Sequence, residues 1–99
     1  MPSYYDDAMR DDLTSLKNIG PASARQLREV DIADAAALRK LGAVAAYRRL
    51  KHAFPRQVGL LMLYALEGAL RDCHWNSLPE GVKDRLKRAV AAQSRSRSA

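Results

Sequence analysis

The sequence predicts an all-α protein, a compact bundle of five to six short helices in one domain. Three observations support this fold class. Ala and Leu dominate the apolar residues while Val, Ile, Thr and Phe are scarce, which favours helix over sheet. Apolar residues recur every three or four positions, and Gly or Pro interrupts these runs at short intervals. The 99 residues are enough for one domain, and the longest apolar run is far shorter than the roughly 20 residues of a membrane span.

Three short helices are expected in the first half of the chain, over residues 11–17, 21–30 and 34–41. Asn18 can adopt the left-handed conformation that ends the first helix. Pro21 lacks an N–H group and therefore suits the first turn of the second helix. Asp34 can cap the third helix with its carboxylate, and Gly42 ends it.

Three further helices are expected over residues 43–53, 56–72 and 77–93. Phe54-Pro55 separates the first two, because proline disfavours helix in the residue before it. The helix over 56–72 is apolar nearly all round, which is typical of a central helix or of one shared with a second subunit. The expected domain covers residues 11–93, between a loose acidic leader (1–10) and a tail (94–99) of alternating Ser and Arg that is expected to be disordered.

The net charge of +6 is unevenly distributed along the chain. Residues 1–12 carry −3, and the remainder carries +9. Such a surface attracts phosphate backbones and acidic proteins, although a solvated surface without a dedicated partner also explains it. The residues that we expect to face an anionic partner are Arg39, Lys40, Arg48, Arg49 and Lys51.

Residues 15–30, SLKNIGPASARQLREV, resemble a helix-hairpin-helix motif. In the DNA-binding form of this motif two glycines make the tight turn, and the N–H groups at the start of the second helix point at a phosphate. Asn18 replaces the first glycine here, and Ala22 stands where a basic residue is frequent. Either the hairpin contacts phosphate or it only packs two helices together. The candidate phosphate-contacting residues are Asn18, Ile19, Gly20, Ser23 and Arg25.

The sequence gives no indication of a catalytic, cofactor or metal site. His52, Cys73 and His74 are the only candidates for nucleophilic or metal chemistry, and the last two are sequence neighbours whose side chains diverge on a helix. A glycine-rich phosphate loop, a zinc-protease motif and a serine elbow are all missing. We therefore predict a protein that is not an enzyme and needs no cofactor. Trp75 is expected either to fill the junction between two helices or to anchor a protein partner.

Four blocks of the sequence together resemble the C-terminal domain of the TfoX (Sxy) competence regulators. They are LKNIGPASARQLREVDI, LGAVAAYRRLK, LLMLYALEGAL and HWNSLPEGVKDRL, and they occur in the family's order over about residues 13–88. The resemblance implies a helix-hairpin-helix or SAM-like fold and a role in the transcriptional control of DNA-uptake genes. TfoX regulators typically carry a further N-terminal domain, and family members tend to have Gly where this chain has Asp31.

Two functions are consistent with these observations. In the first, the chain is a non-enzymatic cytoplasmic module that acts in competence-type transcriptional regulation, by weak contact with the DNA backbone or as an adapter to another regulator or polymerase. In the second, it is a protein–protein interaction or homodimerisation module that does not touch nucleic acid. No membrane contact is expected. One cysteine is consistent with a reducing cytosol.

Overall fold

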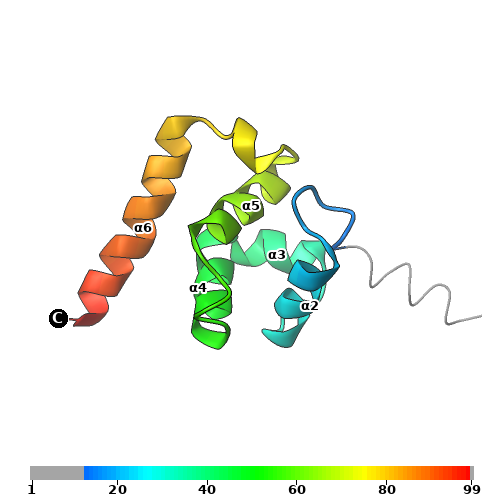
Figure 1. The fold of residues 1–99 in the computed structure, drawn as a ribbon, viewed down its shortest axis with the longest axis horizontal. Helices are drawn as coiled ribbons and strands as arrows, with labels where there is room; N and C mark the ends of the chain where they lie inside the picture. The colour runs from blue at the N-terminus through cyan, green and yellow to red at the C-terminus, as the bar shows by residue number, and fades with distance from the viewer. Residues whose placement is uncertain (1–12, 99) are drawn as a thin grey trace, which may run out of the picture.

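The computed structural model describes the backbone of residues 13–98 and the side chains of residues 13–91. Within this range the protein is all-α, as predicted, and no strand occurs. Its elements are α2 (Pro21–Glu29), α3 (Ala35–Leu41), α4 (Ala43–Ala53), α5 (Leu60–Arg71), a short 3-10 helix η1 (Trp75–Ser77) and α6 (Glu80–Ser98). Figure 1 shows α2 to α5 packed around one another, with the long α6 alongside α4 and α5.

The caps predicted for α3 are present. Asp34 Oδ1 accepts a hydrogen bond of 2.8 Å from the Ala37 N–H, which satisfies one of the free donors at the start of the helix. Gly42 ends α3 at φ +89°, a conformation that disfavours any residue with a Cβ. Asp31 also adopts positive φ, at +68°.

The helix predicted over residues 11–17 is wrong over its described part, because residues 13–18 form consecutive turns. The Leu16 N–H donates to the Leu13 carbonyl and the Ile19 N–H to the Leu16 carbonyl, which are three-residue turn bonds. Asn18, at φ +71°, then directs the chain into α2. The acidic leader, residues 1–10, lies outside the described residues.

Helix α5 begins at Leu60 rather than at residue 56 because the preceding loop is held in another shape. The Lys51 ammonium donates to the carbonyls of Pro55 (2.9 Å) and Val58 (2.7 Å). Val58, only 2% exposed, is thereby placed in the core. The chain passes through this turn before Gly59 starts the helix.

The core lies around α4, which packs against α2, α3, α5 and α6, and α5 leaves Leu60 and Leu61 exposed. The side chains buried most completely lie on six segments of the chain, and they are Leu13, Leu27, Ile32, Leu38, Leu50, Leu63 and Leu66. Burial raises the pKa of the Tyr47 hydroxyl on α4, because the charged phenolate is disfavoured away from water. No polar or charged side chain is buried among the described residues. None of the described helices is long and apolar enough to cross a membrane.

Helix α6 packs its first turns on α4 and α5 through Leu86, with Val82 and Val90 half-buried beside it. Its backbone remains helical through Ser98, whereas the sequence predicted an end near residue 93 and a disordered tail. Ala, Gln and Arg are good helix formers, so the 3.6-residue repeat continues past the point where apolar contacts end.

Candidate functional site

Asn18, predicted to be part of a phosphate-contacting hairpin, directs its side chain inward. Its Nδ2 donates to the carbonyls of Ala65 (3.2 Å) and Cys73 (3.0 Å), and its Oδ1 accepts from the Trp75 N–H (3.1 Å). These three bonds connect the turn before α2 to the middle of α5 and to the segment that follows α5. We call Asn18, Gly68 and the segment 73–75 the Asn18 clamp.

The absence of a side chain at Gly68 allows Asn18 and the Cys73 backbone to approach α5 closely. A Cβ atom at this position would lie 2.6 Å from Asn18 Nδ2 and 2.7 Å from the Cys73 carbonyl oxygen. Both distances are much shorter than a carbon contact allows. The chain returns toward Gly68 because Asp72 ends α5 in the left-handed conformation, and the Cys73 N–H then donates to the Gly68 carbonyl. An isolated glycine inside a helical pattern is the sequence signal for such an approach.

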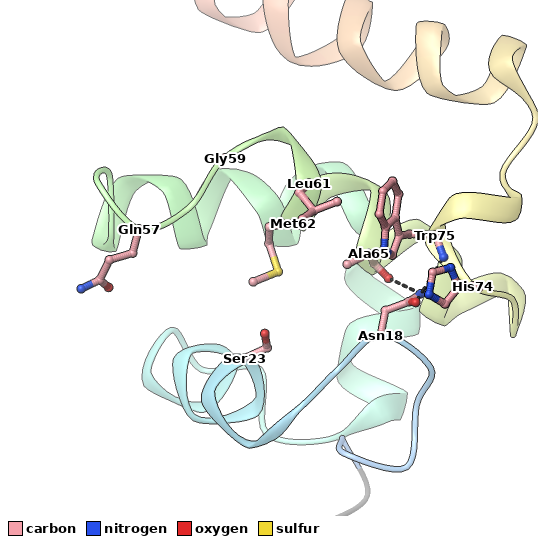
Figure 2. A pocket seen from close by; sticks show the side chains of 9 residues that line it. All are labelled: Asn18, Ser23, Gln57, Gly59, Leu61, Met62, Ala65, His74 and Trp75. Carbon is pink, nitrogen blue, oxygen red and sulfur yellow. Dashed lines mark hydrogen bonds between the residues drawn. The ribbon is translucent and has the colours of Figure 1, made fainter.

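Beside the clamp, a cleft of about 470 Å³ opens between the start of α2 and the first turns of α5. Figure 2 shows Ser23 facing Met62 across it, with Asn18, His74 and Trp75 at one end and Gln57 at the other. The lining residues are Asn18, Ser23, Gln57, Gly59, Leu61, Met62, Ala65, His74 and Trp75. Of these, only Asn18, Ser23 and Trp75 were among the predicted site residues.

The cleft combines an apolar side with hydrogen-bond donors, and no carboxylate lines it. Leu61 is 55% exposed, the largest exposure of any large apolar side chain among the described residues. Ser23, Gln57, His74 and Trp75 contribute polar atoms. His74 Nδ1 accepts from the Asn76 N–H at 3.1 Å, which leaves the proton of the neutral ring on Nε2, as a donor.

Trp75 packs at the junction between α5 and α6 and also lines the cleft. Lys83 of α6 lies 5.6 Å from the centre of the Trp75 ring and 5.7 Å from that of Tyr64. These cation–π contacts connect α6 to α5. The indole also stacks with the ring of His74, with ring centres 5.8 Å apart. Trp75 is therefore partly buried by the fold and partly accessible from the cleft.

The remaining hairpin residues are divided between core and surface. Ile19 is buried at 4% exposure, whereas Gly20 and Arg25 are exposed. Gly20 begins α2 in an extended conformation without a side-chain cap, and a Cβ there would meet no atom within 4 Å. The turn is thus present and the start of α2 is open, but the first helix of the motif is replaced by turns in the described residues.

The predicted basic face is divided by the structure. The Lys51 ammonium donates hydrogen bonds to carbonyls of the loop before α5. Arg49 Nη1 donates to the Val30 carbonyl at 3.0 Å. Arg49 and Lys40 line a smaller depression of about 280 Å³, together with Asp31. Within the described part of the chain, Arg39, Lys40 and Arg48 make no hydrogen bond or ion pair.

The three residues considered for metal or nucleophilic chemistry are not brought together in a metal-binding cluster among the described residues. No three His, Cys, Asp or Glu side chains come together there. Cys73 and His74 belong to the segment held by Asn18, and His52 lies exposed on α4.

Comparisons with known proteins find one protein family and two solved structures that are similar to this chain. The model of the TfoX C-terminal domain matches residues 9–90. A crystal structure of an uncharacterized protein from Listeria monocytogenes, in a triclinic form, is similar with a TM-score of 0.76 and 30% identity, covering 83% of this chain and 92% of that one. A tetragonal crystal structure of a protein of unknown function from the same organism has a TM-score of 0.73 and 33% identity, over 77% and 93% of the two chains. No curated protein matches.

Proposed function

The chain belongs to the family of TfoX C-terminal domains, and on this premise we propose that it is a non-enzymatic adapter in competence-type transcriptional regulation. In this role it binds another regulator or the polymerase through the cleft between α2 and α5. A cytoplasmic location is part of the proposal.

The observation that carries the proposal is the exposed apolar side of the cleft. Leu61 is more than half exposed and Trp75 half-buried, beside unused donors on Ser23 and Gln57. Tryptophan is enriched among the residues that dominate protein interfaces, and an apolar centre with a polar rim is the usual anatomy of such interfaces. A cleft of this kind accepts one or two apolar side chains of a partner and orients them by hydrogen bonds.

The test is binding of purified bacterial RNA polymerase to the chain immobilised by a C-terminal tag. We expect a micromolar dissociation constant that Leu61→Ser weakens about ten-fold, as loss of a buried apolar anchor does. Leu61 is exposed, so this change leaves the fold intact. Arg48→Ser is the matched control on a different surface and leaves binding unchanged. Equal binding by wild type and Leu61→Ser contradicts a role of the cleft. Binding of the immobilised chain to a second copy of itself favours the dimerisation function instead.

A second candidate function is weak contact with the DNA backbone. It is favoured by the open start of α2 at Gly20 and by the unpaired cations Arg39, Lys40 and Arg48. Anisotropy of a labelled random duplex at about 50 and about 200 mM salt distinguishes the two, because each neutralised phosphate steepens the salt dependence by nearly one unit. Micromolar binding that falls ten-fold or more with salt, and that is abolished by the triple change of these cations to Glu, establishes the DNA contact. The adapter function predicts no such binding.

A further inference from the structure

The lining of the cleft has a definite chemical composition. Its walls contain exposed or half-exposed apolar surface from Leu61, Met62 and Trp75, together with hydroxyl and N–H donors. The described residues make no hydrogen bond to the Ser23 hydroxyl or to the Trp75 indole N–H. No carboxylate lines the cleft. A ligand with a ring or aliphatic body next to hydrogen-bond acceptors, carboxylates among them, therefore fits its chemistry.

The chain itself contains such a segment outside the described structure. Residues 4–7 read Tyr-Tyr-Asp-Asp, two aromatic rings followed directly by two carboxylates. The first 12 residues carry −3 and the rest of the chain +9. No Lys or Arg lines the cleft itself, so this opposition attracts the leader to the rest of the chain as a whole, within a Debye length of about 8 Å at physiological ionic strength.

We propose that residues 4–7 dock in the cleft of the same molecule. The rings of Tyr4 and Tyr5 then contact Leu61 and Trp75, and the carboxylates of Asp6 and Asp7 accept hydrogen bonds from the cleft donors. The leader is thereby an occupant that a binding partner must displace, a consequence that rests on the proposed function.

The chain length permits this contact. Asn18, at one end of the cleft, is five residues from Leu13, and consecutive turns shorten that distance. The segment from residue 7 to residue 13 spans up to about 20 Å when extended. A tether this short gives an effective concentration of the order of millimolar, so even millimolar intrinsic affinity leaves the cleft about half occupied.

Trp75 is the only tryptophan of the chain and lines the cleft, so its indole signals report the occupant directly. The experiment follows the indole N–H cross-peak and acrylamide quenching of the full-length chain. In the double variant Tyr4→Ala/Tyr5→Ala we expect the cross-peak to move and quenching to rise about two-fold, since release of a half-occupied cleft doubles its open fraction. Asp6→Asn/Asp7→Asn shifts the cross-peak in the same direction, by less.

Asp11→Asn/Asp12→Asn is the matched control, because it removes the same charge outside the docking residues and leaves Trp75 nearly unchanged. An unmoved cross-peak in both the Tyr and the Asp6/Asp7 variants overturns the proposal. So does a shift that disappears on dilution, which assigns the contact to the leader of a second copy. The measurement uses the free protein, so a failure to bind polymerase leaves its outcome unaffected.

Discussion

Asn18 and Gly20 stand two residues apart in the same turn, yet their surroundings are opposite. Asn18 makes three hydrogen bonds to α5 and to the segment after it, and a Cβ on the facing Gly68 would collide with it. Gly20 is exposed, has an ordinary extended conformation and would tolerate a Cβ without any contact.

The difference separates residues that the fold requires from residues that it permits. The Asn18 clamp is a structural device, so its residue types follow from packing and hydrogen bonding. The start of α2 is not fixed in this way, because several residue types, serine among them, fit at Gly20 with an equal or better helix cap. Stability measurements on the two regions should therefore give opposite results.

The largest expected effect is that of Gly68→Ala. The added methyl collides with Asn18 and with the Cys73 backbone, so the clamp must open, and we expect a loss of about 3 kcal/mol, at the upper end of overpacking costs. For a domain of this size that lowers Tm by on the order of 15 °C. Thermal unfolding by circular dichroism measures the shift.

Gly81→Ala is the matched control, because Gly81 is helical and nothing lies near its would-be Cβ. This variant should gain up to about 1 kcal/mol from the better helix propensity of alanine. Equal Tm values for the two variants would contradict the steric role of Gly68.

The next effect is that of Asn18→Ala, which removes three hydrogen bonds and leaves partly buried backbone groups without partners. We expect a loss of about 2 kcal/mol. Asn18→Gly tests the cause, because glycine adopts φ +71° without strain but cannot form the bonds. If bonding dominates, the glycine variant recovers less than half of the loss in urea unfolding. Full recovery of the free energy of unfolding in Asn18→Gly would show that asparagine is needed for the left-handed backbone conformation and not for the hydrogen bonds of the clamp.

The sequence predicted what depends on neighbouring residues and missed what depends on distant ones. The cap at Asp34 and the end of α3 at Gly42 follow from local chemistry, and both are confirmed. The later start of α5 depends on Lys51 reaching over the loop, and a lysine on a helix gives no sign of which carbonyls it will meet. A hydrogen bond by Asn18 to a residue 55 positions away is equally invisible to motif reasoning.

The dependence on distant residues also explains why the sequence did not predict most of the candidate site. Spacing alone assigned Arg49 and Lys51 to one face for an anionic partner, whereas the structure engages both with backbone carbonyls. The cleft forms from α2, α5 and the segment after α5, which are joined only in the fold. Leu61 belonged to an apolar run that predicted a covered helix, and only the packing of the neighbours leaves it exposed.

The smallest expected effect concerns Gly20. Gly20→Ser introduces a hydroxyl at the first position before α2, where it can accept from a free helical N–H. Since the backbone there is already extended and the space is open, we expect a gain of a few tenths of a kcal/mol, the usual difference between serine and glycine caps. Gly59→Ser is the matched control at the start of α5, which also lacks a side-chain cap.

Measuring duplex binding distinguishes the glycine cap of α2 from the introduced serine cap further. If the N–H groups at the start of α2 receive an anionic group of a partner, the introduced serine hydroxyl competes for them, so Gly20→Ser stabilises the protein and weakens binding of the duplex together. Opposite signs in the unfolding and anisotropy measurements then identify Gly20 as a residue kept for contact. If stability rises and duplex binding is unchanged, or absent in both proteins, the open start of α2 is a feature of the turn alone, and the functional surface is the cleft beside it.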